Sequence, residues 1–386
     1  MGDIMKIKLL NKIAEVGLKQ FDDKYEIGED VNDEEGILVR SASLHEYEMN
    51  EKLLGIARAG AGVNNIPIED CSEKGIVVFN TPGANANAVK ELVLCALFLA
   101  SRKVVEGIDW VKTLEGNDDA GKLVEKGKSQ FVGPEIEGKT LGVIGLGAIG
   151  VNVANAAIKL GMNVYGYDPY ISVNAAWHMS KWVQEAKNIE TILKECDYIT
   201  LHAPSTKETK GMINADAFAL MKDGVKILNF ARGDLVNTQD LLDAVESGKV
   251  SKYITDFACK EIINKDNIVV MPHLGASTPE SEDNCAKMAV KQLKDYLETG
   301  NITNSVNFPA VNEPRSAKYR ICIIHKNVPT MLAKFATLFA DANINIENMI
   351  NKAKGNFAYT IIETNDLVDE AKLAEVENVI KVRILK

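Results

Sequence analysis

Short apolar runs alternate with longer amphipathic stretches through the central part of the chain. Within the stretches, apolar residues recur three or four positions apart, as Ile149, Val153, Ala157 and Leu160 do. That spacing places them on one face of a helix, whereas short apolar runs are typical of buried strands. The runs lie at residues 140–144, 163–168, 198–201, 226–229, 253–256 and 268–271. Strands that alternate with helices predict an α/β fold with a doubly wound parallel sheet.

A second α/β pattern precedes this region. Strand-like runs lie at residues 6–10, 36–39, 56–57 and 76–78, and an amphipathic stretch at 281–298 would return the chain to them. We therefore expect a discontinuous domain, residues 1–94 and 278–308, with a domain of residues 95–277 inserted in it. Pro309 and Pro314 lie in residues 305–316, which we interpret as a linker.

The last seventy residues follow a different pattern. Strand-like runs at 320–324, 344–353, 357–363 and 379–384 are interrupted by helix-like stretches at 330–342 and 367–375. The order is strand, helix, two strands, helix, strand. That βαββαβ order predicts a ferredoxin-like domain at residues 317–386.

Composition narrows the class of protein. The 386 residues are 46% hydrophobic and 25% charged, and the net charge of −10 argues against a nucleic-acid partner. The longest apolar run, residues 92–100, is too short to cross a membrane, and the start, Met1 to Lys6, lacks the apolar core of a signal peptide. The six cysteines form no CxxC pair, so we expect neither disulfides nor a metal site. These features predict a cytoplasmic protein.

A nucleotide-binding fingerprint follows the strand at 140–144. Gly145, Gly147 and Gly150 form Gly-x-Gly-x-x-Gly between a strand and a helix, and Asp168 ends the next strand, 168 − 150 = 18 residues further on. Such glycines let backbone N–H groups approach a pyrophosphate, and the acid binds the ribose. The glycine motif alone is often just a turn, but the strand, helix and acid around it favour a Rossmann-like domain that binds a dinucleotide.

Three chemically suited residues follow the fingerprint in order. Arg232 lies in Asn-Phe-Ala-Arg-Gly, Glu261 in Asp-Phe-Ala-Cys-Lys-Glu, and His273 in Pro-His-Leu-Gly-Ala-Ser-Thr. An arginine can hold a carboxylate with a fork of donors. An imidazole exchanges a proton near neutral pH, and a carboxylate beside it favours its charged form. The trio is what an enzyme needs to move a hydride and a proton at a hydroxyl carbon.

With these motifs the chain resembles the D-2-hydroxyacid dehydrogenase family along its whole length. Its C-terminal region resembles an ACT domain. The motifs that carry the resemblance are residues 39–42, 58–63 and 80–83, the fingerprint, His202-Ala203-Pro204, residues 229–233 and residues 272–278.

The resemblance implies NAD as the cofactor and roles for individual residues. Arg232 would orient the substrate, His273 would be the acid/base, and Glu261 its partner. Asp256 would hold the nicotinamide carboxamide. The other residues expected to line the cofactor are Ala61, Gly145, Gly147, Ala148, Ile149, Gly150, Asp168, Ala203, Phe230, Ala231, Arg232, His273, Gly275 and Ala276.

For the substrate, the resemblance implies a doubly anionic molecule that Arg40, Ser41, Arg58 and Gly60 would contact. The narrower expectation is oxidation of 3-phospho-D-glycerate to 3-phosphohydroxypyruvate, on the route to L-serine. Another D-2-hydroxy acid, in glyoxylate or 2-hydroxyglutarate chemistry, remains an alternative. A non-enzymatic alternative is an NAD-sensing corepressor-like scaffold.

Some residues depart from the family pattern or have a plainer interpretation. Asn64 stands where the family often has Asp, and Ile262 where Pro is usual. Ser129-Gln130 replaces a position that is frequently basic. His202 has no carboxylate motif with it, so we interpret it as a hydrogen-bonded residue beside the cofactor. Arg40 and Arg58 could be surface cations, although their positions just after predicted strands favour substrate contact.

Regulation and assembly are also implied. His325 and Asn327, with Asn345 eighteen residues later (345 − 327 = 18), match the loop and second amide that bind serine in some family members, whereas Thr330 replaces the glycine of that motif. We therefore expect L-serine as a possible effector, against a purely structural tail. The family pairs through its cofactor domain, so we expect a homo-oligomer, a dimer or tetramer, with residues 92–100 and their flanks as a candidate face.

Overall fold

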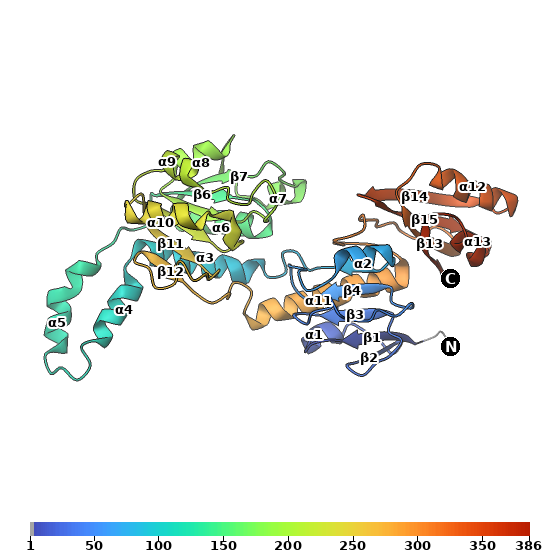
Figure 1. Ribbon diagram of the computed structural model, residues 1–386, viewed down its shortest axis with the longest axis horizontal. Helices are drawn as coiled ribbons and strands as arrows, with labels where there is room; N and C mark the ends of the chain where they lie inside the picture. Colours follow the sequence, from blue (N-terminus) through green and yellow to red (C-terminus); the bar gives the residue numbers. More distant parts are fainter. Residues whose placement is uncertain (1–3) are drawn as a thin grey trace. The chain divides into compact units, whose positions relative to one another are not determined.

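The computed structural model describes residues 4–386, and only part of the Met1 to Lys6 start considered above lies within it. The chain forms two compact units (Figure 1). Unit 1 contains residues 1–85 and 279–386, and unit 2 contains residues 86–278. The expected division at 94/95 lies nine residues after this boundary, because the whole helix α3 (Ala86–Ser101) packs in the core of unit 2.

Unit 2 is built on a seven-stranded sheet with the order β12-β11-β10-β9-β6-β7-β8. Every neighbouring pair is parallel, which confirms the predicted doubly wound sheet. The order in which strands are added to the sheet reverses at β6, whose neighbours are β7 on one side and β9 on the other. Ligands bind such folds beyond the carboxyl ends of the strands at this switch point. The strands are β6 (Thr140–Ile144), β7 (Asn163–Tyr167), β8 (Gln184–Glu185), β9 (Tyr198–Leu201), β10 (Val225–Asn229), β11 (Val250–Thr255) and β12 (Ile268–Val270).

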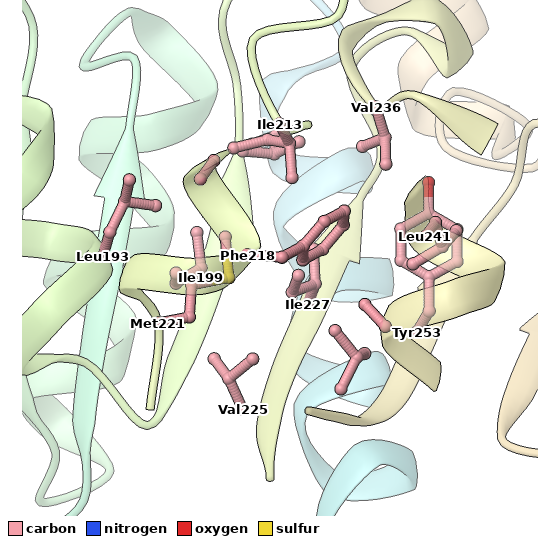
Figure 2. Packing of buried hydrophobic residues seen from close by; sticks show 14 of the residues in the cluster. Leu193, Ile199, Ile213, Phe218, Met221, Val225, Ile227, Val236, Leu241 and Tyr253 are labelled. Atoms are coloured by element: carbon pink, nitrogen blue, oxygen red, sulfur yellow. The ribbon is translucent and has the colours of Figure 1, made fainter. Parts of the chain in front are cut away.

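Helices cover both faces of this sheet because its strands are apolar on both sides. Helices α3 and α6 (Ala148–Lys159) pack on one core cluster. The other cluster contains residues of α8 (Ile189–Glu195), α9 (Ala215–Leu220) and α10 (Thr238–Glu246), and Figure 2 labels ten of its members. Asn188, Asn214 and Asn237 cap these three helices with their side-chain oxygens. Helix α7 (Val173–His178) follows β7.

A helical arm extends from unit 2 after α3 (Figure 1). It contains α4 (Val104–Lys112), α5 (Ala120–Gly127) and the 3₁₀ helix η1 (Lys128–Phe131), none of which buries a residue. The rings of Trp110 and Phe131 contact each other, and Lys252 of β11 forms an ion pair with Glu106 of α4. The arm therefore has almost no core of its own.

Unit 1 begins with a five-stranded parallel sheet of order β2-β1-β3-β4-β5. The long helix α11 (Pro279–Thr299) returns to this sheet, as the amphipathic stretch predicted. Gly17 of α1 (Glu15–Leu18) permits close packing on α11, since a Cβ there would lie 2.7 Å from the backbone of Ala286. The remaining elements are β1 (Met5–Leu9), β2 (Tyr25–Gly28), β3 (Gly36–Val39), β4 (Gly55–Arg58), α2 (Ile68–Glu73) and β5 (Val77–Phe79).

The C-terminal part of unit 1 has the predicted βαββαβ order. Its antiparallel sheet runs β14-β15-β13-β16, the ferredoxin-like arrangement. The elements are β13 (Tyr319–Lys326), α12 (Met331–Asp341), β14 (Ile346–Lys354), β15 (Phe357–Thr364), α13 (Glu370–Ala374) and β16 (Val379–Leu385). No helix within residues 4–386 is long and apolar enough to span a membrane.

Candidate active site

The glycine loop after β6 has the geometry that a pyrophosphate requires. Gly145 has a φ of +94°, and a Cβ there would lie 2.6 Å from the carbonyl carbon of His202. A Cβ on Gly150 would lie 1.9 Å from the oxygen of Gly145, so these two positions require glycine. Gly147, the N-cap residue of α6, has open space where its side chain would be. The loop thus leaves the amino end of α6 accessible to an anion.

Asp168 lies just after β7, the strand that pairs with β6. Its Oδ2 accepts the N–H of Leu146 at 2.8 Å, and its Oδ1 accepts the N–H of Tyr170 at 2.8 Å. These bonds fix the carboxylate beside the glycine loop. Each oxygen keeps a lone pair for a ribose hydroxyl. The following residues, Pro169 and Tyr170, offer no cation for a 2′-phosphate.

Asp256, just after β11, is the buried acid of the site. It is 2% exposed, and burial raises the pKa of its carboxyl group. Its Oδ2 accepts the N–H of Gly275 at 3.1 Å, whereas its Oδ1 has no partner within residues 4–386. A buried acceptor without a donor is costly. A carboxamide N–H would supply the missing donor, so this atom fits the nicotinamide role.

A buried network fixes the loop that carries Arg232. Asn229 is fully buried, and its Nδ2 donates to the carbonyl of Arg232 at 2.9 Å. The hydroxyl of Thr255 donates to the carbonyl of Asn229 at 2.8 Å. The guanidinium of Arg232 is exposed and donates to the carbonyl of Ala231 at 2.6 Å. The loop is therefore rigid, while the guanidinium keeps donors for a ligand.

His273 and Glu261 are both exposed. The imidazole of His273 packs against the ring of Phe257, with centroids 4.8 Å apart. Glu261 lies 3.6 Å from the amine of Lys260, and the pKa of its carboxyl group is lowered, chiefly by a hydrogen bond to its own backbone N–H. Within residues 4–386 no ion pair joins Glu261 to His273, so the partnership implied by the resemblance remains a prediction.

His202 is not suited to proton transfer. Burial lowers the pKa of its imidazole to about 3, so the ring is neutral at physiological pH. Its Nε2 lies 3.0 Å from the hydroxyl of Thr200. The residue lies against the glycine loop at Gly145, which agrees with the structural interpretation of its motif.

In unit 1, the residues predicted for the substrate gather at the carboxyl edge of the first sheet. Arg40 and Ser41 follow β3, and Gly60 and Ala61 follow β4. The guanidinium of Arg58 donates to the carbonyls of Arg40, at 3.0 Å, and Gly62. This contact ties the two loops together. N–H donors of the Arg58 guanidinium are therefore already bonded to carbonyls of the protein.

The side chain of Arg40 remains 45% exposed and is paired with Glu282 at 2.6 Å. Its loop is held by Asn11, a residue that the sequence did not single out. The Oδ1 of Asn11 accepts the N–H groups of Arg40, Ser41 and Ala42 at 3.0, 2.9 and 2.9 Å. A turn-type residue two positions after the first strand is the only sequence signal for this role.

The three residues predicted to bind an effector differ in exposure. His325 is buried, and its ring nitrogens lie 2.7 Å from the carbonyl of Lys326 and 2.9 Å from the hydroxyl of Thr360. Asn327 and Asn345 are exposed and bond to Gly355 and Glu347. The amides are thus more accessible to a ligand than the imidazole. Thr330, which replaces the glycine of the motif, has a left-handed φ of 72°, a conformation that favours glycine.

The sequence profile of the family described as "D-isomer specific 2-hydroxyacid dehydrogenase, NAD binding domain" matches residues 94–275. Residues 94–275 therefore belong to the NAD-binding domain of the D-isomer specific 2-hydroxyacid dehydrogenases. The matched segment contains the fingerprint, Asp168, Asp256 and the catalytic candidates of unit 2.

Individual relatives agree with this family. The D-3-phosphoglycerate dehydrogenase of Methanocaldococcus jannaschii is 33% identical over 89% of this chain, which covers 64% of that protein. The human D-3-phosphoglycerate dehydrogenase is 35% identical over 76% of this chain, which covers 54% of it. The chain therefore spans between half and two thirds of the length of these relatives. A crystal structure of NAD⁺-bound 3-phosphoglycerate dehydrogenase from Entamoeba histolytica aligns with a TM-score of 0.60 at 29% identity, covering 78% of this chain and 98% of that chain.

Proposed function

We propose that the protein oxidises 3-phospho-D-glycerate to 3-phosphohydroxypyruvate with NAD. The observation that carries the proposal is the buried, donor-free Oδ1 of Asp256, in a fold whose glycine loop accepts a pyrophosphate. The resemblance to relatives named D-3-phosphoglycerate dehydrogenase supports the substrate.

None of the six cysteines, all within residues 4–386, forms a disulfide, which supports a reducing, cytoplasmic location.

In this mechanism the chain binds, orients and deprotonates the substrate. Arg232 holds the carboxylate and the reacting oxygen with its fork of N–H donors. His273 accepts the proton of the C2 hydroxyl as the C2–H bond breaks, and a carbonyl forms at C2. The nicotinamide ring, when bound, supplies the acceptor for the hydride. Asp256 orients that ring through its carboxamide, and Glu261 favours the protonated imidazole.

Initial-rate kinetics on a panel of 2-hydroxy and 2-oxo acids test the proposal. We expect the highest kcat/KM with 3-phospho-D-glycerate and NAD. A preference for an unphosphorylated acid would favour the other dehydrogenase activities, and no turnover with any acid would favour a cofactor-sensing scaffold. Because Asp168 repels a 2′-phosphate, NADP should be a poor cofactor. Comparable kcat/KM with NADP would contradict the role of Asp168.

Arg40 should recognise the phosphate end of the substrate. Hydrogen bonds to charged groups contribute about 1.5–3 kcal/mol, so Arg40→Met should raise KM for phosphoglycerate roughly tenfold to 100-fold. The KM for an unphosphorylated hydroxy acid should change far less. Lys12→Met, which removes an exposed cation three residues beyond the end of the first strand, is the matched control. Equal losses on both substrates would assign Arg40 to structure or to the shared carboxylate.

The arm of unit 2 supports a homo-oligomer. Val93 and Leu97 of the expected face are buried in the core of unit 2, but Phe98, Ile108 and Val111 are 46%, 53% and 47% exposed. A helical segment with exposed apolar residues and almost no core is typical of an interface.

Light scattering at micromolar concentration should therefore give a mass of two or four chains of 42.2 kDa. Ile108→Asp should reduce that mass by placing a charge in the interface. Val173→Asp, at an apolar residue that is 75% exposed on α7, should leave it unchanged. A monomeric wild type contradicts the proposal.

We also propose L-serine as a feedback effector at Asn327 and Asn345. Amide groups can satisfy an amino acid's ammonium, carboxylate and hydroxyl without burying a net charge. Millimolar L-serine should therefore inhibit the wild type, and Asn345→Ala should raise the inhibitory concentration. Asn343→Ala, at a neighbouring exposed amide, is the control. Absence of inhibition in the wild type leaves the C-terminal domain a structural role.

A further inference from the structure

Both faces of the C-terminal sheet are covered. Helices α12 and α13 cover one face with residues such as Phe335, Phe339 and Leu373. The other face packs in the same core cluster as the first sheet of unit 1 and α11. Within that cluster, the C-terminal sheet contributes Cys322, Ile324, Tyr359 and Ile361, and the remainder of unit 1 contributes Tyr296, Leu297, Ile302 and Phe308. An apolar face buried in this way is part of a core rather than a free surface.

A buried ion pair lies at this junction. Arg320 is 1% exposed and Glu363 is 0% exposed, and the guanidinium bonds to Oε1 of Glu363 at 2.7 and 2.8 Å. Arg320 also donates to the carbonyl of Thr299, at 2.9 Å, and to that of Glu313, at 3.0 Å. Its donors therefore join the C-terminal sheet to the end of α11 and to the connecting segment. Buried charges are stable only with such partners.

Side chains of the C-terminal domain cap carbonyls at the carboxyl end of α11. The last carbonyls of a helix have no partner within the helix and carry partial negative charge. Arg383 donates to the carbonyl of Leu297 at 2.8 Å and stacks on the ring of Tyr296 at 4.9 Å. The hydroxyl of Tyr359 donates to the carbonyl of Gly300 at 2.6 Å. Together with Arg320, whose charge is paired with Glu363, these side chains bond to three carbonyls at or just after the end of α11.

Gly300 permits this approach. Its φ is +75°, and a Cβ there would lie 2.4 Å from Sγ of Cys322. At the other edge, Lys381 of β16 donates to the carbonyl of Leu53 at 2.7 Å, just before β4. The contacts thus extend from the end of α11 to the first sheet.

We infer that the C-terminal domain and the substrate-binding part of unit 1 form one cooperative body, joined at the carboxyl end of α11, instead of two modules tethered by residues 305–316. An effector bound to the C-terminal domain then acts on the body that carries Arg40 and Arg58. Helix α11, whose carboxyl end carries this junction, begins at Pro279, six residues after His273 in the chain.

Hydrogen exchange of the full chain tests the inference, because residues that open together share one opening free energy. In Arg383→Met, which keeps the side chain's apolar length, exchange should become at least tenfold faster in peptides from β13–β16. The same factor should apply to peptides from the last turns of α11 and from β3. The control is Arg315→Met, since among the described residues the Arg315 guanidinium bonds only to residues 317, 318, 385 and 386. Acceleration confined to β13–β16 overturns the inference.

A milder pair of variants guards against gross unfolding. Tyr359→Phe removes only the hydroxyl that caps Gly300, and Tyr319→Phe removes a hydroxyl for which the described residues show no hydrogen bond. The first should accelerate exchange in both regions by one common factor, and the second should not. Unequal factors in the two regions for Tyr359→Phe overturn the inference.

A second experiment, which adds a ligand, rests on the proposed function. Saturating 3-phospho-D-glycerate stabilises whatever body binds it. Exchange should therefore slow in β13–β16 as well as in β3 and β4. Slowing confined to β3 and β4 overturns the inference, whereas no slowing anywhere means that the proposed substrate does not bind. In that case the exchange of the variants alone decides whether the C-terminal domain and the rest of unit 1 open together or separately.

Discussion

Replacing His273 by alanine should lower kcat by about 10²–10⁴-fold, which is the usual contribution of a positioned acid or base. The imidazole is exposed and packs on Phe257, so its removal leaves no buried cavity. The affinity for NAD should stay near that of the wild type, because the glycine loop and Asp168 are unchanged. Stopped-flow or initial-rate measurements of kcat, with NAD binding measured separately by fluorescence, give the two quantities.

The matched control is His178→Ala. His178 is an exposed histidine of the same unit, at the end of α7, with its Nδ1 2.7 Å from the carbonyl of Asn174. It should leave kcat unchanged. If the His273 variant retained more than a tenth of the activity, another group would carry the proton. His202, whose imidazole is neutral at physiological pH, is poorly suited to replace it.

The strands with strong apolar runs were predictable, and the weak edge strands were not. Every strand of the unit 2 sheet from β6 to β12 was expected except β8, which has only two exposed residues, Gln184 and Glu185. Strand β2 (Tyr25–Gly28) was also missed, because an edge strand with one buried residue shows no clear apolar run. Strand β2 pairs with β1, and strand β8 pairs with β7, and these pairings become visible only in the folded structure.

The site shows the same division between local and distant information. Gly145, Gly150 and Asp168 follow one another closely, so their spacing predicts a shared role. Asn11 acts on a loop 29 residues away, and an asparagine after a strand is otherwise an ordinary turn residue. The network of Asn229 depends on Thr255, 26 residues further on. No local pattern indicates such contacts.

The C-terminal junction illustrates the limit most clearly. Two prolines in residues 305–316 predicted a linker, but not that one face of the sheet beyond it is buried in the core of unit 1. Arg320 is a charged residue within a strand, and the pattern of polar and apolar positions would place such a residue on the solvent-facing side. In the structure it is 1% exposed because its partners come from α11 and the connecting segment.

Arg232→Lys should lower kcat/KM roughly tenfold to 100-fold, although it keeps the positive charge. Lysine has a compact ammonium group and cannot make the two parallel bonds of a guanidinium to a carboxylate. Losing one bond to a charged group costs about 1.5–3 kcal/mol, which sets the size of the expected effect. The loop itself should be unaffected, because Asn229 bonds to the backbone of residue 232 and not to its side chain.

Steady-state kinetics with 3-phospho-D-glycerate, or with whichever acid the panel prefers, measure this loss. Arg102→Lys changes an exposed arginine of the same unit and should behave as the wild type. Near-normal kcat/KM in Arg232→Lys would show that position 232 contributes charge alone. A loss in both kcat and kcat/KM would instead place the fork on the reacting oxygen in the transition state, since an interaction made only there lowers the two constants equally.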